Sequence, residues 1–553
     1  MIATIILGFI LLAGMSPSRY LFEISKYLEI YNEATSQIIA SYVDSITPEK
    51  IIKTALNAML NALDPYTTFY EEKELEEYKF LTTGEYGGIG AVIGKDTSSK
   101  YVYIIDLYDE GPAKKNGLRR GDFITEISEK STQNLSVEEA SSLLRGVPGT
   151  KVSIKVKRIF PADSVFSLTL TRQEIKVPDI PFTSLLNDST GYLKLNSFTE
   201  GIAAEVRKKF DSLKKEGAKS FILDLRGNGG GLLNEAISIC SIFLPEGKIC
   251  VKTSGRNQEW SRNYYTIASS NDTSIPLAVL IDENSASASE IVAGAIQDYD
   301  RGVIIGSPSF GKGLIQQTRD LPYDTKLKIT VARYHTPSGR CIQKIDYSRR
   351  DDSNNPVYYP DSLHKIFYTK NNRPVKSFEG IIPDVPVKDT INSSILTSQF
   401  YSKFIFWFCV YYYNTHPSDS SILDDNQKLW NEFTNYLKKN QWTDTPILPL
   451  EESLKQIETP SPVKDSTLLA DIKPDINQIK RKINEYKENE LNKTRKEVIQ
   501  VVKQRLLSFY KSTSSSYRYY VENDTVVRTA ISILSDHEKY KSILCPSIKI
   551  KNN

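Results

Sequence analysis

The chain has 553 residues, of which 40% are hydrophobic and 25% charged, and its formal net charge is only +3. A chain of this length is too long for one hydrophobic core, so three or four domains are expected. The nearly balanced charge gives no reason to expect nucleic acid as a partner. The five cysteines are an odd number, so at least one stays unpaired within the chain, and they indicate no cellular compartment.

The chain begins with an apolar stretch, Ile2 to Gly14. These thirteen apolar or small residues resemble the hydrophobic part of a signal peptide and are too few for a confident membrane span. The basic residues that usually precede such a stretch are missing, since the first charged side chain is Arg19. Either the start codon is misplaced or the segment is an unusual signal or anchor. We expect residues 1–18 to be a signal peptide or membrane anchor, and the protein to be exported, periplasmic or associated with the cell envelope.

Residues 19–83 are predicted to form an N-terminal helical region. Such a region can pack against the rest of the chain or join two copies as a dimerisation element. A homo-oligomer or an adaptor protein is therefore a possible partner.

Residues 84–172 have the glycine turns and alternating strands of a small β-rich domain. Strands are expected at Tyr101–Leu107, Lys151–Arg158 and Phe166–Leu170, and an amphipathic helix at Leu135–Arg145. The pattern resembles a PDZ domain, which is β-rich with two helices. A dinucleotide-binding interpretation of its glycines fails because their spacing is wrong and no helix follows them.

The resemblance to a PDZ domain implies a site for a peptide C-terminus. The glycine-rich stretch Gly87, Gly88, Ile89 and Gly90 can turn several N–H groups toward one point, which suits a free carboxylate. The bound peptide would add as an extra strand at the sheet edge. The expected partners are protein or peptide substrates with free C-termini.

A glycine-rich turn follows in the second half of the chain. Ser220–Leu225 is a strand of buried type, Arg226 to Gly231 a turn, and Leu232–Phe243 a helix. A phosphate-binding turn is the alternative, but no Gly-Lys-Ser/Thr follows and no GxGxxG is present. We expect the backbone of Gly230 or Gly231 to donate to an oxyanion, because such turns present unpaired N–H groups at the carboxyl end of a sheet.

A serine-rich motif, Ser285-Ala286-Ser287-Ala288-Ser289-Glu290, follows the next predicted strand, Pro276–Asp282. A helix is predicted over Ser285–Tyr299, which places Ser287 in its first turn. N–H groups there have no intrahelical partner, so that of Ala288 can donate to a negative oxygen developing next to Ser287.

A lysine between glycines, Lys312, lies on a loop after the predicted strand Gly302–Ile305. Lysine is normally protonated, and it becomes a base near neutral pH only where burial or a nearby positive charge lowers its pKa. The sequence offers that setting, since the side chains of Phe310, Leu314 and Ile315 are expected to surround Lys312.

These motifs together resemble the carboxy-terminal processing proteases, also called tail-specific proteases, over roughly residues 20 to 390. The resemblance implies that Ser287 is the nucleophile and Lys312 the general base. Their separation of 25 residues fits the family pattern. Gln316 matches the glutamine beside the family's lysine, and Asp298 matches an acidic position on the nucleophile's helix. Asp298 lies three turns from Ser287, so it is expected to give structural support.

Further family landmarks occur on both sides of these motifs. Leu63-Asp64-Pro65 resembles the turn before the PDZ domain, and Asp224 and Arg226 belong to a D-L-R-x-N-x-G-G pattern that supports the site. Two later segments, 334–340 and 380–384, fit the family, although His335 replaces the usual aromatic residue.

The other serines and the histidines have simpler interpretations. Ser285 and Ser289 are expected to be N-cap or helix-surface hydroxyls. The four histidines of the chain lie in neither a G-x-S-x-G nor an H-E-x-x-H context, so a conventional triad and a zinc protease are disfavoured.

The last region, residues 391–553, contains no recognisable chemistry. The run Phe404–Tyr413 is predicted to be a buried core helix, because ten residues are too short for a membrane span. Residues 473–510 are predicted to form one long basic amphipathic helix. The region can cradle substrate, join copies or bind a partner.

The sequence therefore predicts a multidomain α/β protein with the PDZ domain inserted before a protease core at residues 173–390. The family resemblance implies a core of the crotonase type and helical N- and C-terminal regions. It implies a serine endopeptidase with a Ser/Lys dyad, no cofactor and no metal. The alternative is a catalytically inactive PDZ-based scaffold, which the intact Ser287, Lys312 and Gln316 disfavour.

Overall fold

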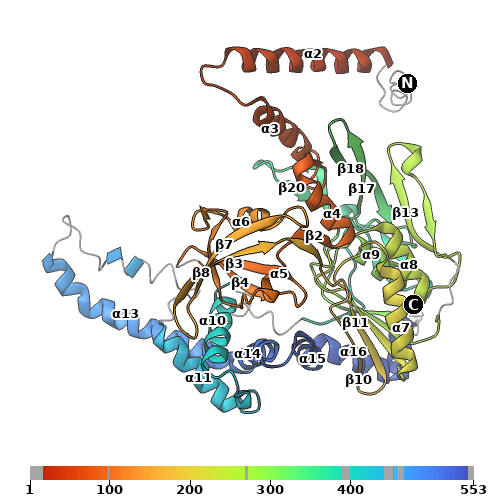
Figure 1. The fold of residues 1–553 in the computed structure, drawn as a ribbon. Coiled ribbons are helices and arrows are strands. Elements are labelled where there is room, and N and C mark those ends of the chain that lie inside the picture. The colour runs from red at the N-terminus through yellow and green to blue at the C-terminus, as the bar shows by residue number, and fades with distance from the viewer. Residues whose placement is uncertain are drawn as a thin grey trace.

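The computed structural model describes residues 17–96, 99–267, 272–388, 399–440, 453–454, 456–457 and 466–545. In Figure 1 an N-terminal helical arm, a small β domain, a large α/β unit and a row of C-terminal helices can be distinguished. Apart from residues 17 and 18, the predicted signal or anchor segment lies outside the described residues. Among the helices described, none is both long and apolar enough to cross a membrane.

A six-stranded sheet forms the centre of the α/β unit, in the order β10-β11-β12-β15-β16-β23. The strands from β11 to β23 are parallel, and β10 pairs antiparallel with β11. Every residue of β12 and β15 is buried, as expected for parallel strands covered on both faces. The strands predicted before the three motif loops are confirmed to within one residue at each end. The bounds are Phe182–Leu186 (β10), Thr190–Lys194 (β11), Ser220–Asp224 (β12), Leu277–Ile281 (β15), Val303–Gly306 (β16) and Val385–Pro386 (β23).

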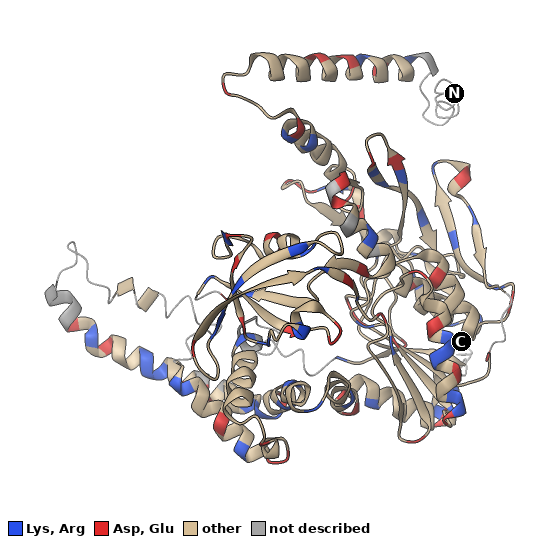
Figure 2. Cartoon of the chain, in the orientation of Figure 1, with Lys and Arg blue, Asp and Glu red and all other residues tan. Residues whose placement is uncertain are grey.

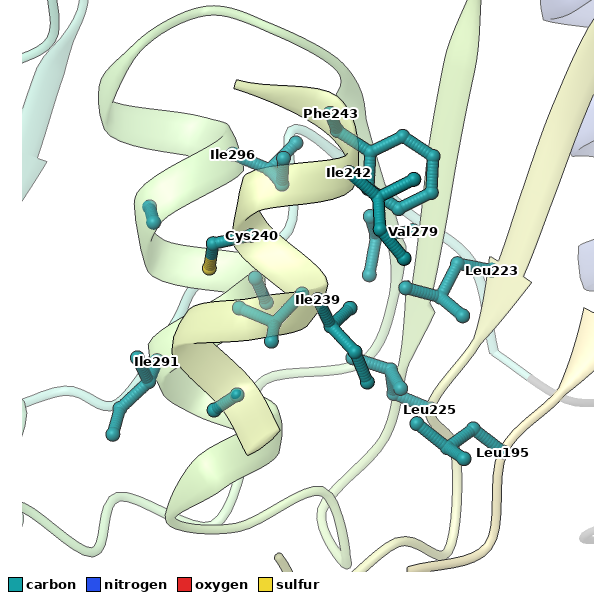
Figure 3. Packing of buried hydrophobic residues seen from close by; sticks show 14 of the residues in the cluster. Leu195, Leu223, Leu225, Ile239, Cys240, Ile242, Phe243, Val279, Ile291 and Ile296 are labelled. Carbon is teal, nitrogen blue, oxygen red and sulfur yellow. The ribbon is translucent and has the colours of Figure 1, made fainter. Parts of the chain in front are cut away.

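Three helices cover one face of this sheet: α7 (Ile202–Lys215), α8 (Leu233–Phe243) and α9 (Ala288–Asp298). Figure 3 shows side chains of α8 and α9, such as Ile239 and Ile296, packed toward Leu223 and Val279 of the strands. Full burial of one such side chain contributes about 1.5–3 kcal/mol. This layer fixes α8 and α9, and therefore the loops that lead into them.

The opposite face of the same sheet is covered by the last three helices of the chain, α15 (Thr513–Asn523), α16 (Thr525–Ser535) and α17 (His537–Leu544). Val527 and Ile533 of α16 belong to one buried cluster with Ile222 and Leu280 of the strands. The hydroxyl of Tyr540 accepts the N–H of Leu277 at 3.0 Å. The C-terminal helices thus complete the core of the α/β unit.

The small domain is built on a second sheet, with strand order β3-β4-β5-β7-β8 and β6 paired to β5. The strands that were predicted from alternating hydrophobicity are confirmed as β7 and β8. The predicted amphipathic helix is confirmed as α6, which begins with a capping box at Ser136. Strand β3 pairs only with β4 and is an edge of this sheet. The elements are Ala91–Lys95 (β3), Val102–Leu107 (β4), Pro112–Lys115 (α5), Phe123–Ile127 (β5), Lys130–Ser131 (β6), Val137–Leu144 (α6), Lys151–Arg158 (β7) and Ser164–Thr171 (β8). The two-stranded pair β2 (Glu85–Gly88) and β9 (Gln173–Lys176) joins the start and the end of the domain.

A third sheet stands beside the α/β unit, with β18 at its centre. Strand β18 (Thr325–His335) pairs with β17, β1 and β13, and β13 pairs with β14. The partners are Thr68–Tyr70 (β1), Ile249–Gly255 (β13), Asn263–Tyr265 (β14) and Leu314–Leu321 (β17). Two further hairpins are β19 (Ile345–Arg350) with β20 (Pro356–Tyr358), and β21 (Ile366–Tyr368) with β22 (Pro374–Lys376).

The predicted N-terminal helical region consists of α2 (Pro17–Ser41), α3 (Pro48–Asn61) and α4 (Leu75–Thr83), with β1 between the last two. Figure 1 shows α2 extending away from the body of the molecule. Strand β1 joins the third sheet, so the region is not wholly helical.

The remaining helices are α10 (Gln399–Thr415), α11 (Asn426–Lys439), α13 (Ser466–Lys493) and α14 (Arg495–Tyr510). The buried core helix predicted at Phe404–Tyr413 is confirmed as part of α10, where Phe408 and Cys409 are fully buried. The single helix predicted over 473–510 is wrong, because α13 ends and α14 begins around Thr494. The Thr494 hydroxyl donates to the carbonyl of Leu491, a local bond that competes with helix continuation. Figure 2 shows charges of both signs along α13, so this helix is not a basic surface.

Candidate active site

The predicted nucleophile, Ser287, is the N-cap residue of α9. Its φ of 55° and ψ of −111° lie in a region that residues with a side chain rarely adopt. Such strain persists only where the surroundings hold it, and it concentrates at functional sites. The carbonyl of Ser287 accepts the buried hydroxyl of Tyr334 at 3.1 Å. The next N–H, that of Ala288, belongs to a first helical turn and has no intrahelical acceptor.

The carboxylate of Glu290 connects the serine turn to the lysine loop. Its Oε2 accepts the N–H groups of Ser287 at 2.8 Å and Lys312 at 3.0 Å. Its Oε1 accepts the Ser309 hydroxyl at 2.6 Å and the Gly311 N–H at 2.7 Å. Burial raises the pKa of Glu290 to about 7, and these donors oppose the shift. One buried side chain therefore fixes the backbone at both predicted catalytic positions.

The prediction that Ser285 and Ser289 are N-cap or helix-surface residues needs correction. Both Ser285 and Ser289 are fully buried. The Ser285 hydroxyl donates to the carbonyl of Leu225 at 2.9 Å, and the Ser289 hydroxyl donates to the carbonyl of Asn228 at 2.9 Å. Alternation along the motif directs these hydroxyls toward the glycine-rich turn, and they hold that turn against the start of α9.

The glycine-rich turn lies directly against Ser287. Gly230 has a φ of +104°, and a Cβ at this position would lie 2.8 Å from the Cβ of Ser287, so only glycine fits. The prediction of Gly230 as an oxyanion donor needs correction, because its N–H already donates to Oδ1 of Asn228 at 2.9 Å. Gly231 also has a positive φ, and its backbone lines the same cavity as Ser287 and Ala288. Gly231 thus remains the candidate for the second donor.

The supporting pair predicted at the start of this turn is a buried ion network. Arg226 donates to Oδ2 of Asp224 at 2.6 Å and to Oδ2 of Asp524 at 2.8 Å. The hydroxyl of Tyr192 also donates to Asp224 at 2.7 Å. Burial opposes the charge of Asp224, but Arg226 and Lys194 hold the pKa of its carboxyl well below the usual range. Asp524 comes from the C-terminal region, so that region reaches the base of the glycine-rich turn.

The predicted base, Lys312, carries an ammonium that lies over the ring of Tyr66, 4.2 Å from its centroid. Burial and the positive charge of Lys328 lower the pKa of Lys312 to about 8. The expected cause was partly wrong, because Phe310 is 42% exposed and cannot shield the ammonium. Leu314 does line the cavity, and the shielding that the sequence analysis missed comes from Tyr66.

Tyr66 belongs to the Leu63-Asp64-Pro65 turn, which had been assigned no part in the site. Oδ1 of Asp64 accepts the N–H groups of Tyr66 and Thr67, each at 2.8 Å. The Tyr66 hydroxyl is 3.2 Å from that of Tyr347, and the two rings meet edge to face. The turn thereby holds the Tyr66 ring over Lys312.

Ser287, Lys312 and Gln316 line one cavity of about 460 Å³. The described residues contain no hydrogen bond between the Ser287 hydroxyl and the Lys312 ammonium. Catalytic hydrogen bonds are often long in unliganded enzymes and tighten when substrate binds. The Gln316 amide donates to the Thr330 hydroxyl at 3.1 Å, which orients it along the cavity wall.

Asp298 lies at the other end of α9, away from this cavity. Its carboxylate forms an ion pair with Arg340 at 3.0 Å and accepts the N–H of Ser338 at 2.9 Å. These contacts tie the end of α9 to the segment 334–340, which is a structural role.

The four residues predicted to bind a peptide C-terminus lie in two different elements, a strand and the link that follows it. Gly87 and Gly88 lie in β2 opposite Glu174 and Gln173 of β9, so they help to pair these strands. Ile89 and Gly90 link β2 to the edge strand β3. The carbonyl of Ile89 accepts the N–H of Ala113 at 2.8 Å.

Comparison with known proteins identifies the family. The model of peptidase family S41 matches residues 189–348, a PDZ domain model matches 103–158, and the model named "Probable PDZ-protease, C-terminal helical domain" matches 395–534. The "Carboxy-terminal-processing protease" of Bartonella bacilliformis is 35% identical over 324 residues, which are 58% of this chain and 73% of that protein. The chain belongs to the carboxy-terminal processing proteases.

Other members of the family agree with this assignment. The "Carboxy-terminal processing protease CtpA" of Bacillus subtilis is 31% identical over 369 residues, or 66% of this chain and 77% of that protein. The Synechocystis "Carboxyl-terminal-processing protease" is 32% identical over 366 residues, or 62% and 84%. This carboxy-terminal processing protease is a serine protease with a PDZ domain and a helical C-terminal region, and it acts on peptides or proteins.

Four residues near the site of this protease escaped the sequence analysis: Tyr66, Glu290, Lys328 and Asp524. A signal existed for Glu290, because Ser287 and Glu290 have the spacing of a capping box. The other three come close to the site only through tertiary contacts.

Proposed function

We propose that this protease cleaves proteins presented by their C-terminal tails, with Ser287 as nucleophile and Lys312 as general base. The observation that supports this most strongly is the pairing of a strained serine with a lysine whose pKa is about 8, in one cavity. A lysine with that pKa is partly neutral near physiological pH and can accept a proton.

The proposed reaction is acyl transfer through a covalent intermediate. Lys312 takes the proton of the Ser287 hydroxyl while the oxygen attacks the scissile carbonyl, and it later gives this proton to the leaving amine. The developing oxyanion accepts hydrogen bonds from the backbone N–H groups of Ala288 and Gly231. Lys312 then takes a proton from a water molecule, whose oxygen attacks the acyl carbon. The bond from that carbon to the Ser287 oxygen breaks, and Lys312 returns the proton to this oxygen as the carboxylic acid product leaves. For the first step the Lys312 side chain moves from the Tyr66 ring to the serine.

Tail recognition is proposed for the PDZ domain. The edge strand β3 supports it, because a substrate tail can add to this edge as a further strand. The backbone N–H groups of Ile89 and Gly90, which link β2 to β3, would donate hydrogen bonds to the carboxylate of the tail. Gly87 and Gly88 would contribute by pairing β2 with β9, which holds this link in place.

The remaining assignments follow from the family. We propose that the core within residues 173–390 is of the crotonase type, for which the central parallel sheet is the support. We also propose export to the periplasm or cell envelope, on the strength of the apolar segment at residues 2–14.

Digestion of an unfolded protein by wild type and variants tests the catalytic proposal. Ser287→Ala should lower the rate by at least about four orders of magnitude. The matched control is Ser289→Ala, which removes a buried hydroxyl from the same turn. It should cost about 1–3 kcal/mol of stability and keep most of the activity. Equal loss in both variants would show that the wrong serine was chosen, and an inactive wild type would favour the scaffold.

Tail recognition has a separate test. A substrate with a free apolar C-terminus should be cleaved faster than its amidated twin, because amidation removes the charge that the N–H groups attract. Identical rates would refute tail recognition and leave the catalytic assignment untouched.

A further inference from the structure

A second lysine, Lys328, lines the catalytic cavity, and the reaction described above gives it no task. It belongs to β18, where it pairs with Thr318 of β17 and Thr68 of β1. Thr318 and Gln316 of the neighbouring strand line the same wall of the cavity. The strand register therefore directs the Lys328 side chain toward the space that Ser287 and Lys312 share.

The ammonium of Lys328 has no anionic partner among the side chains that the structure describes. Within the described residues it forms neither a hydrogen bond nor an ion pair, whereas Lys326, two residues earlier, pairs with Asp320. Burial lowers the pKa of Lys328, and no carboxylate opposes this shift. A lysine that only covers apolar surface keeps its ammonium in water, so Lys328 differs from such a residue.

The charged residues that line the cavity are both positive. Of its described lining residues, Lys312 and Lys328 are the ones with a formal charge, and none is acidic. The other polar residues that line it are Tyr78, Thr82, Asn196, Ser197, Ser287, Gln316, Thr318 and Tyr334. When Lys312 is neutral and acts as a base, Lys328 holds the formal charge of the cavity. A partly buried ammonium without a counter-ion is unfavourable, and a bound anion offsets part of that cost.

We propose that Lys328 binds a carboxylate of the substrate, so that the protease prefers peptides with an acidic group close to the bond that it cleaves. The carboxylate can be the side chain of Asp or Glu or the terminal carboxylate of a short tail. This inference rests on the proposed function, because it places the scissile bond at Ser287. Lys328 is a specificity residue and takes no part in proton transfer.

A competing role for Lys328 is only to lower the pKa of Lys312, without binding substrate. Its positive charge lowers the pKa of Lys312, so its removal should move the pH–rate profile to higher pH whether or not it binds substrate. Selectivity between an acidic and a neutral substrate separates the two roles, because a change in the pKa of Lys312 affects both substrates equally.

The experiment uses the full chain and paired fluorogenic peptides. In each pair a Glu, moved through the positions around the scissile bond, is compared with Gln, and each peptide is made with a free and an amidated C-terminus. The variants are Lys328→Met, which keeps the stem, and Lys328→Glu. Lys326→Met is the matched control, because it removes the same charge from the same strand outside the cavity. Ratios of kcat/KM are taken on the plateau of each pH profile.

Wild type should prefer Glu over Gln at one position, or the free over the amidated terminus, by roughly tenfold to a hundredfold, as expected for a hydrogen bond to a charged group. Lys328→Met should abolish that preference, and Lys328→Glu should favour a Lys-containing peptide. Lys326→Met should keep the wild-type ratio. A preference for the free terminus that persists in Lys328→Met belongs to the PDZ domain.

Two results would overturn the inference. A wild-type enzyme that cleaves all peptides without regard to charge would refute it and leave the proposed function intact. A charge preference that survives in Lys328→Met, accompanied only by a shifted pH profile, would show that Lys328 merely tunes Lys312. Failure of wild type to cleave any peptide, with the Ser287→Ala variant equally inactive, would instead refute the proposed function.

Discussion

The proposed role of Lys312 as general base predicts the pH dependence of the reaction. A general base must be neutral, and the pKa of Lys312 is about 8. Activity should therefore rise about tenfold per pH unit below pH 8 and level off above it. Lys312→Arg should eliminate turnover at every pH, because a guanidinium stays protonated in proteins. Steady-state rates between pH 6 and pH 10, about two units on each side of the pKa, give the measurement. Substantial cleavage by Lys312→Arg would mean that another group is the base.

Tyr66 has two opposed effects on Lys312. Its ring excludes water, which favours the neutral amine, and its face attracts the cation, which favours the ammonium. Because burial is the main cause of the lowered pKa of Lys312, Tyr66→Ala should move the inflection of the pH–rate profile upward toward the unperturbed lysine value of about 10.4. Tyr66→Phe keeps the ring and is the matched control, with a profile like that of wild type. A downward shift in Tyr66→Ala would show that attraction by the ring outweighs burial.

The limit of sequence reasoning is visible at these residues. Ser287 and Lys312 could be located because each follows a recognisable strand and loop within 25 residues of the other. The ring that covers Lys312 comes from a turn near position 66, and nothing local in the sequence indicates that contact. Phe310 was chosen as the shield because it is near in sequence, yet a neighbour in an extended loop can point into solvent, as Phe310 does.

At the scale of elements, the C-terminal helices stabilise the active-site turn through Asp524. Its Oδ1 accepts the Val527 N–H and caps α16, while its Oδ2 accepts the guanidinium of Arg226. Asp524→Asn keeps an oxygen for the cap and turns an amide toward Arg226. We expect a loss of about 1–3 kcal/mol of stability and a lower kcat with little change in KM. Thermal denaturation and steady-state kinetics measure these effects.

A matched control exists for this change at the next helix. Asp536 is exposed and caps α17 by accepting the N–H of Lys539, and within the described chain it forms no ion pair with an arginine. Asp536→Asn should leave kcat unchanged. If both variants behave alike, Asp524 acts as a helix cap alone and does not position the glycine-rich turn.

The family motifs indicated the elements around the site, but not how the last third of the chain relates to it. Residues 473–510 were predicted as one helix from their amphipathic pattern, which continues across the break at Thr494 and so conceals it. The sequence does not indicate what the apolar faces of α15 to α17 pack against. Their partner is the second face of a sheet whose strands β10 to β16 lie within residues 182–306, more than 200 residues earlier. A contact of such range leaves no periodic signal.

At the scale of the whole molecule, the helical region connects the PDZ domain to the protease core. Trp407 of α10 stacks on Phe123 of β5, with ring centroids 5.1 Å apart, and Tyr103 packs against the same ring. Lys403 forms an ion pair with Asp96 at 2.9 Å, and Arg120 donates to the carbonyl of Ser508. Because α15 to α17 cover the protease sheet, one helical region contacts both functional parts. We therefore expect the helical region to fix how a tail, if the PDZ domain holds it as proposed, approaches Ser287.

Trp407→Ala tests this connection. Removing the ring should cost about 3–5 kcal/mol locally and loosen the PDZ domain, so the preference for a free over an amidated tail should fall severalfold in long substrates. Cleavage of a short peptide that reaches only the cavity should stay within about twofold of wild type, because no residue of α10 is among the described residues that line the cavity. Hydrogen exchange should rise in β4 and β5.

Phe433→Ala, which removes a buried ring of the helical bundle next to Phe408, is the control and should keep the tail preference. If Trp407→Ala also keeps it, then the β2 and β9 pair alone suffices to orient the PDZ domain.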